Sequence, residues 1–228
     1  MMIKQTTLMT LAILLTTTGT VLAEQHDKVA QQGKKITAAT EVYNELLATP
    51  DRSVPKELLE NCKCIAVLPS VVKVAVGIGA RHGSGVMTCR TPTGWSAPAF
   101  VNLSGGNFGL QLGANSTDLV LFFMTDKGAR SLVKGTKITL GGNASVAAGP
   151  WGRSGEADTN LELKSEIYSY ARSKGLFAGL SFEGARLAPN PKDITDYYGP
   201  GVTAEQLLFG GSPASKRSES LAFGVTFP

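Results

Sequence analysis

Short apolar runs with a period of two fill the chain from Cys64 to Met124, and clusters of Gly, Pro, Asn and Ser separate them. This period is typical of half-buried β-strands, and evenly spaced turn residues are typical of an antiparallel meander or barrel. Strands are predicted over 65–68, 73–80, 85–89, 99–103 and 108–112, with a hairpin turn over 81–85. The run 119–124 is apolar on both faces, so we expect it to be the most buried strand.

Helical periodicity precedes this region. A series of residues over 25–48 recurs in steps of three and four, which predicts an amphipathic helix; its members are Val29, Gly33, Ile36, Thr40, Tyr43 and Leu47. Short helices are expected over 55–59, over 128–133 behind a Thr125-Asp126 cap, and after a capping box at 203–206. Further strands are expected over 137–140 and 145–148, and a hairpin over 161–171 and 176–183. The expected fold class is α+β: a β-rich antiparallel barrel or sandwich core with an N-terminal amphipathic helix and short flanking helices.

The first 23 residues have the features of a targeting segment. Lys4 precedes the apolar stretch 8–15, and Val21 and Ala23 provide the small residues of a cleavage site. The apolar stretch is too short to span a bilayer comfortably. We therefore expect a signal peptide over 1–23, with an uncleaved anchor as the alternative, one domain over 24–211 and a tail over 212–228. The expected location is periplasmic or secreted, with peripheral membrane association.

Three cysteines, Cys62, Cys64 and Cys89, predict one disulfide and one free thiol in an oxidising compartment. Cys62 and Cys64 would point to the same face of a strand, which makes them poor partners for each other. Either one could pair with Cys89, and Cys64 is the favoured partner.

Basic residues are concentrated in the middle of the chain. From Lys63 to Lys137 there are eight Lys or Arg residues and two acids, Asp118 and Asp126, which gives a net charge of +6. An anionic lipid surface attracts each nearby basic residue by on the order of 1 kcal/mol. A solvated face that keeps the protein soluble is the alternative. Nucleic acid is not expected as a partner, because no basic run with interleaved aromatic residues occurs.

Motifs for catalysis are missing from the sequence. The fragment 77–79 begins like a dinucleotide loop but lacks the later glycine and the helix that such a loop needs. Neither a Gly-x-Ser-x-Gly elbow nor a phosphate-binding Walker loop occurs. Three Cys and two distant His, His26 and His82, lack tetrahedral ligand spacing, so no metal is expected. We expect a protein without enzymatic activity and without a cofactor.

Ordered motifs across residues 30–210 resemble the SYLF domain family. The run Cys64–Ser70 is similar to the first strand and Pro-containing turn of that domain, and Gly94–Val101 to its most recognisable motif. Further matches follow in order at 109–113, 117–121, 147–150, 170–179 and 197–199. The resemblance implies phospholipid binding, with phosphoinositides favoured by eukaryotic relatives, some of which also bind and bundle actin. Given the expected export signal, actin and phosphoinositides are not expected as partners here.

The expected function is reversible, non-enzymatic binding of anionic phospholipid headgroups in the bacterial cell envelope. An envelope structural or interaction protein that binds a protein partner through the same scaffold is the alternative. The helix over 25–48 would either insert its apolar face into the membrane interface or pack it on the sheet. The candidate headgroup ligands are Lys28, Lys34, Lys35, Arg81, Lys127, Arg130, Lys134, Arg172 and Lys174.

Overall fold

The computed structural model describes residues 3–49, 54–76, 78–92, 94–108, 113–134, 137–142, 144–150, 165–173, 176–179, 182 and 184–210. Within these ranges, side chains are described except those of residues 3–24, 75, 76, 78, 107, 108, 113 and 179. The side chains of the predicted signal peptide therefore lie outside the described residues, as do Lys174 and the predicted tail over 212–228.

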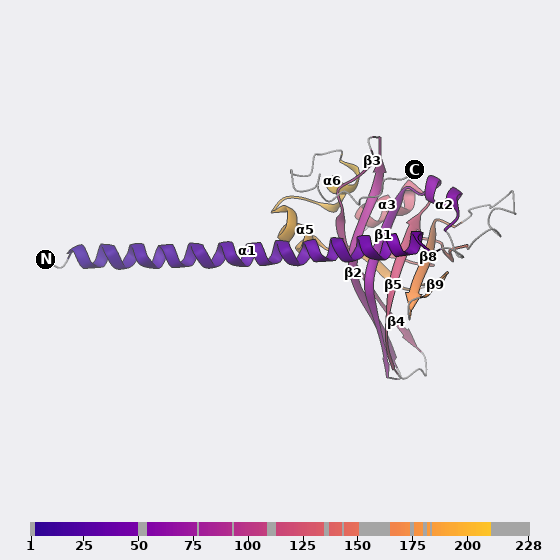
Figure 1. Cartoon of the computed structure of the whole chain (residues 1–228), viewed down its shortest axis with the longest axis horizontal. Helices are drawn as coiled ribbons and strands as arrows, with labels where there is room; N and C mark the ends of the chain where they lie inside the picture. The colour runs from indigo at the N-terminus through magenta and orange to yellow at the C-terminus, as the bar shows by residue number, and fades with distance from the viewer. Residues whose placement is uncertain are drawn as a thin grey trace.

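In the described part of the chain, ten strands form one curled sheet with the shape of a half-barrel (Figure 1). The strand order is β6-β10-β4-β2-β1-β5-β8-β7, with β3 paired to β2 and β9 paired to β8. Neighbours are antiparallel except β7 and β8, which are parallel. The strands are β1 (Cys64–Val76), β2 (Ile78–Thr91), β3 (Gly94–Trp95), β4 (Ala99–Phe108), β5 (Gly113–Phe123), β6 (Ile138–Thr139), β7 (Val146–Ala148), β8 (Ile167–Ser173), β9 (Leu176–Gly179) and β10 (Arg186–Pro189). The predicted α+β class with a β-rich, mainly antiparallel core is confirmed.

Helices cover both faces of this sheet. They are α1 (Ile3–Leu47), α2 (Lys56–Asn61), α3 (Asp126–Lys134), α5 (Pro191–Tyr198) and α6 (Ala204–Phe209). Successive residues of a strand point to opposite faces. Phe122 lies 6.5 Å from the Tyr43 ring of α1, whereas the next residue, Phe123, approaches Gly128 of α3. Helices α1 and α3 therefore lie on opposite faces (Figure 1). Helix α5 contacts α1, and α6 contacts α3.

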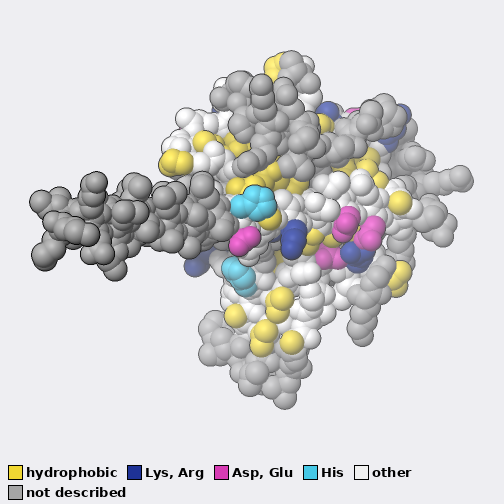
Figure 2. Space-filling model, turned by 60° about the vertical axis from the view of Figure 1, so that its left-hand side comes forward, with side chains coloured by type: hydrophobic (Ala, Val, Ile, Leu, Met, Phe, Trp, Pro, Cys, Tyr) yellow, Lys and Arg dark blue, Asp and Glu magenta, His cyan; other side chains and the backbone are white. Residues whose placement is uncertain are grey.

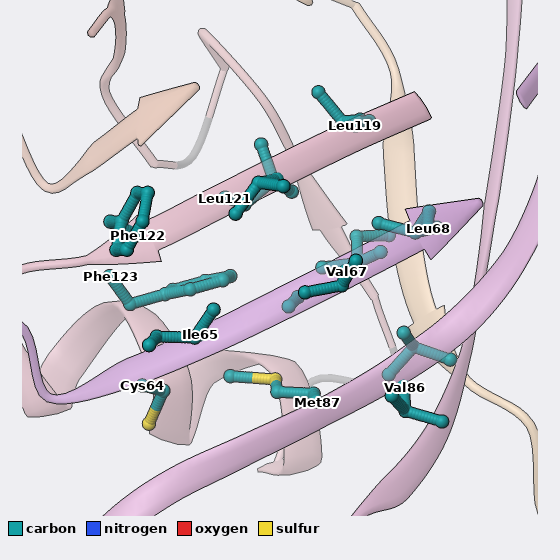
Figure 3. Packing of buried hydrophobic residues seen from close by; sticks show 14 of the residues in the cluster. Cys64, Ile65, Val67, Leu68, Val86, Met87, Leu119, Leu121, Phe122 and Phe123 are labelled. Carbon is teal, nitrogen blue, oxygen red and sulfur yellow. The ribbon is translucent and has the colours of Figure 1, made fainter. Parts of the chain in front are cut away.

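The core is centred on β1, β2 and β5, whose apolar side chains pack together (Figure 3). Residues Leu119–Phe123 of β5 are completely buried, which confirms the prediction for this part of the run 119–124, whereas Met124 follows the strand and is half-buried. Both neighbours of β5 in the sheet are long or apolar strands, and helices cover both its faces. A strand in this position has no solvent-facing side, so it loses the alternation of polar and apolar residues.

The apolar face of α1 packs on the sheet. Ile36 and Tyr43 are buried, and Val29 and Leu47 are partly buried against the core. Side chains that already contribute to the core are not available to insert into a lipid interface. Of the two arrangements considered for residues 25–48, the structure has the packed one. Among the described residues, no helix is sufficiently long and apolar to cross a membrane.

The hairpin turn predicted over 81–85 is wrong, because these residues lie in the middle of β2. The chain instead reverses between Val76 and Ile78, which are paired at the end of the β1–β2 ladder. Gly85 is present for a different reason: β1 bulges towards it. A Cβ atom on Gly85 would overlap the carbonyl oxygen of Val67 and lie 2.6 Å from the Cα of Leu68. Glycine allows this close approach because it has no side chain.

The bulge itself lies at Pro69-Ser70, where a turn was expected from the resemblance. The register of β1 shifts between Leu68 and Val71 against β5, and Ser70 has a left-handed φ of 56°. Asp118 of β5 stabilises this conformation, because its Oδ1 accepts a hydrogen bond from the Ser70 amide at 2.8 Å. Strand β1 therefore continues through the proline, and the sheet bends without ending.

A disulfide joins Cys64 to Cys89, which are register partners on β1 and β2. Cys62 is a free, fully buried thiol. The expectation that Cys62 shares a strand face with Cys64 is wrong, since Cys62 caps the C-terminus of α2 before β1 begins. Its thiol donates to the Leu59 carbonyl at 3.2 Å.

Candidate functional site

Three of the predicted basic residues come together on the solvent side of α3. Lys127, Arg130 and Lys134 are exposed and spaced by three and four residues, so they lie along one side of the helix. We refer to these three residues as the basic face of α3. Its opposite side is apolar, where Ala129 and Leu132 are completely buried. This division fixes the direction in which the three cations point.

The start of α3 is set by the predicted cap. Thr125 Oγ1 accepts a hydrogen bond from the amide of Gly128 at 3.2 Å, which satisfies one of the unpaired donors of the first turn. The acidic residue Asp126 lies in this first turn and the basic residue Lys134 in the last, and both charges match the helix dipole. The sequence thus specifies where the helix begins and which side carries the cations.

The contacts made by the basic face leave it accessible. The ammonium group of Lys127 lies 3.8 Å from Glu166 Oε1 with its side chain 84% exposed, an ion pair that contributes little in water. The guanidinium group of Arg130 lies over the ring of Phe209 in α6, 4.5 Å from its centroid. This cation–π contact orients Arg130 while its donors stay at the surface.

An apolar pocket of about 350 Å³ adjoins α3. We call it the α3–α6 pocket. It begins at Val133, the residue before Lys134, and extends between the start of α5 and the start of α6. The capping box of α6 forms one wall, in which Thr203 Oγ1 accepts from the Gln206 amide at 3.2 Å. The lining residues are Val133, Pro189, Pro191, Ile194, Val202, Thr203, Ala204 and Glu205.

The predicted cations of α1 lie apart from α3. Lys35 forms an ion pair with Asp193 of α5 at 2.5 Å, and Asp193 also accepts from Gln32 at 3.1 Å. Lys35 therefore joins two helices and is not free to bind a headgroup. Lys28 is half-buried on the same helix, and Lys34 is exposed.

The remaining candidates are scattered over the sheet. Arg172 of β8 contacts the carboxylates of Glu45 and Asp118, so its charge is neutralised within the fold. Arg81 of β2 is half-buried with its guanidinium 5.6 Å from the Phe182 ring centroid. Lys174 lies outside the described residues. Of the eight candidates that the structure describes, it groups Lys127, Arg130 and Lys134 on one accessible surface.

A second accessible surface lies at the end of the sheet that α1 does not cover. Val72 and Val74 of β1, beyond the bulge, are 43% and 47% exposed. Figure 2 shows a group of hydrophobic side chains at this end of the molecule. Their register partners on β2 are His82 and Ala80, both exposed. The surface is apolar and carries few charges, in contrast to the basic face of α3.

The titration properties of the described residues do not indicate a catalytic centre. Burial raises the pKa of the Cys62 thiol to about 11, so it stays protonated at neutral pH and is a poor nucleophile. Burial also raises the pKa of the Tyr43, Tyr170 and Tyr198 hydroxyls. Within the described ranges, no group of three His, Cys, Asp or Glu residues could hold a metal ion.

Comparison with known proteins identifies a family for this chain. The family described as "Ysc84: Las17-binding protein actin regulator" matches residues 104–222, slightly more than half of the chain. The chain belongs to the Ysc84 family. The predicted SYLF membership is thereby confirmed. The matched segment includes α3, α5 and α6, and therefore both the basic face of α3 and the α3–α6 pocket.

Relatives from animals and yeast extend the match towards the N-terminus. The chain is 34% identical over 193 residues to human "SH3 domain-containing YSC84-like protein 1", which covers 83% of this chain and 56% of the human protein. It is 35% identical over 186 residues to Saccharomyces cerevisiae "Protein YSC84", covering 77% of this chain and 40% of that one. The chain thus spans about half the length, or less, of these curated relatives.

These comparisons correct the prediction about partners. Actin was not expected, but the family description names an actin regulator and a Las17-binding protein, and one yeast relative is named "LAS seventeen-binding protein 3". Protein partners with an actin-related function are what these names indicate. The prediction failed because it rested on features outside the domain, among them the expected export signal, and not on the domain itself. The family description names a binding protein and regulator, in line with a non-enzymatic role.

Proposed function

We propose that this chain is a non-enzymatic domain that binds anionic phospholipid membranes reversibly through the basic face of α3. The observation that carries the proposal is the placement of Lys127, Arg130 and Lys134 along one exposed side of a short helix. Three cations in one row can approach a lipid surface together, whereas isolated cations on different faces cannot.

The strength of such a contact follows from the number of cations. Each Lys or Arg near an anionic leaflet contributes on the order of 1 kcal/mol, so the basic face of α3 contributes roughly 3 kcal/mol. This supports weak, reversible attachment to the membrane. The attachment depends on salt, because the attraction between exposed charges decays over about 8 Å at physiological ionic strength. Lys35 of α1 and Arg172 contribute less, since both are already paired with carboxylates.

The proposal includes a location. If residues 1–23 are removed as a signal peptide, the folded domain acts in the cell envelope, where phosphatidylglycerol and cardiolipin supply anionic headgroups. The features in favour are Lys4, the apolar stretch after it and the small residues before Glu24. Mass spectrometry of the exported protein tests this part, because cleavage predicts a chain that begins at Glu24.

Binding of an actin-regulating protein, or of actin, is the second candidate function. The names of the family and of the yeast relatives support it. The uncovered end of the sheet with Val72 and Val74 offers an apolar surface for a protein partner. Co-sedimentation with actin filaments tests this candidate. Loss of pelleting in Val72→Ser/Val74→Ser would locate the contact, and no pelleting of the unaltered protein would reject it for actin.

Co-sedimentation with vesicles tests the lipid proposal. The protein is mixed with vesicles of phosphatidylcholine alone, or with phosphatidylglycerol added, at low and at high salt. We expect binding that requires phosphatidylglycerol and weakens as salt rises. Equal binding to neutral vesicles, or no binding to either composition at low salt, would reject the proposal.

A further inference from the structure

We propose that the α3–α6 pocket binds the single acyl chain of an anionic amphiphile, whose headgroup then contacts the basic face of α3. The inference rests on the proposed function for the headgroup contact and extends it by naming the ligand class. The acyl chain would be held in the pocket of the protein, so the ligand is bound as a single molecule and not only as part of a bilayer surface.

The lining of the pocket favours hydrocarbon. Six of its residues are aliphatic or proline: Val133, Pro189, Pro191, Ile194, Val202 and Ala204. The hydroxyl of Thr203 is engaged in the capping box of α6. A polar ligand group placed among these side chains would lose its hydrogen bonds with water without replacing them, whereas a chain of methylene groups would not.

The size of the pocket favours one chain. Its volume of about 350 Å³ lies at the lower end of the range for small-molecule sites, which is roughly 300–1,000 Å³. A phospholipid with two long chains needs more room. A lysophospholipid or a fatty acid presents one chain and a single anionic group, which suits a small apolar pocket beside cations.

Charge complementarity places the headgroup. Val133 lines the pocket, and its neighbour Lys134 and Arg130 one turn earlier belong to the basic face of α3. Glu205 is the charged residue of the lining and is exposed in the first turn of α6. Its carboxylate repels a negative headgroup from that side. The headgroup of a bound amphiphile is therefore directed towards α3.

Calorimetric titration of the full chain tests this inference with three probes. The first is lauroyl-lysophosphatidylglycerol below its critical micelle concentration. The second is glycerophosphoglycerol, which has the same headgroup without a chain. The third is dodecyl maltoside, with a chain of the same length and an uncharged headgroup. We expect one molecule of the first to bind, no measurable binding of the second, and at least tenfold weaker binding of the third.

Variants that fill the pocket locate the bound chain. We expect Val133→Trp to weaken lysophosphatidylglycerol binding at least tenfold while vesicle binding stays within twofold, since the three cations remain. Ala204→Leu fills the same pocket with a smaller increase in side-chain volume. It is the variant to measure if Val133→Trp lowers the melting temperature of the protein. Leu176→Trp, at a position 73% exposed on β9, is the matched control.

Two results would overturn the inference. One is an unchanged affinity for lysophosphatidylglycerol in both pocket variants, which would show that the acyl chain binds elsewhere. The other is self-association of the free protein that Val133→Trp abolishes, which would assign the pocket to a second copy of the chain. The two proposals fail separately. Vesicle binding without lysophosphatidylglycerol binding would refute this inference alone, and the reverse result would refute the proposed bilayer contact alone.

Discussion

Arg172 and Asp118 are register partners on neighbouring strands β8 and β5, and two nitrogens of the guanidinium reach one carboxylate oxygen. Arg172 Nε and Nη2 lie 2.8 and 2.7 Å from Asp118 Oδ2. The other oxygen of Asp118 accepts from the Ser70 amide. One carboxylate thus connects β8 to the bulge of β1, and Arg172 connects both to Glu45 of α1.

We expect Asp118→Ala to lower the free energy of unfolding by about 2–3 kcal/mol, because Nε and Nη2 of Arg172 and the Ser70 amide lose their acceptor in a largely buried site, while the contact of Arg172 with Glu45 remains. Urea unfolding monitored by circular dichroism measures the change. Lys56→Ala is the control, since its ion pair with Glu60 is exposed and should contribute less than about 0.5 kcal/mol. A loss no larger than that of the control would show that the Asp118 contacts are not important for stability.

Gly85 should tolerate no side chain. Gly85→Ala places a methyl group against the backbone of Val67 and Leu68, and separating β1 from β2 at this point should cost roughly 3 kcal/mol or more. Gly33→Ala is the matched change in α1, where nothing lies within 4 Å of the added atom. There we expect stabilisation by about 0.5–1 kcal/mol from helix propensity. Thermal unfolding of both variants measures these opposite changes in stability. A Gly85→Ala protein as stable as the unaltered one would contradict the close approach of β1 to Gly85.

The buried thiol of Cys62 should make stability fall at alkaline pH. Its pKa is raised from 9.0 to about 11 by burial, so the folded state keeps the proton that the unfolded state loses. The contribution of this thiol to the free energy of unfolding is fully present below pH 9 and is lost as the pH rises from 9 to 11, by about 3 kcal/mol. Urea unfolding across this range in Cys62→Ala should show a smaller decrease than in the unaltered protein. Parallel curves for the two proteins would contradict the predicted linkage.

Removing the charge of Glu205 should strengthen binding to anionic lipid. In Glu205→Gln the repulsion beside the basic face of α3 disappears, and we expect roughly a two- to fivefold rise in affinity for phosphatidylglycerol vesicles at low salt. The gain should vanish at high salt because the charge is exposed. Glu57→Gln, in the first turn of α2, is the control with the same change of charge. An equal rise in both variants would indicate only an effect of net charge.

Several elements were predictable because their signals are local. The run 119–124 was identified as a buried strand from its lack of polar residues, and the caps at Thr125 and Thr203 marked helices that the structure contains. Helix α5 was missed, although Asn190 followed by Pro191 is a readable start signal, and Asn190 accepts from the Asp193 amide. Proline suits the first position of a helix because its fixed φ is a helical one.

The failures have long-range causes. The turn predicted over 81–85 came from glycines that serve a bulge in another strand, and no local pattern reveals that contact. Lys35 and Arg172 were candidate headgroup ligands because their partners, 158 and 54 residues away in sequence, are brought to them only by the fold. The α3–α6 pocket depends on three separate segments meeting, so its lining could not be read from any one of them.

Vesicle co-sedimentation of Arg130→Gln/Lys134→Gln beside Lys56→Gln/Lys63→Gln shows whether the membrane contact is made by the basic face of α3. Both double variants remove two exposed positive charges, but only the first removes them from the basic face of α3. At about 1 kcal/mol per cation, the first should bind phosphatidylglycerol vesicles more than tenfold more weakly at low salt, and the second should bind like the unaltered protein. Equal loss of binding in the two variants, or no loss in the first, would contradict membrane binding through the basic face of α3.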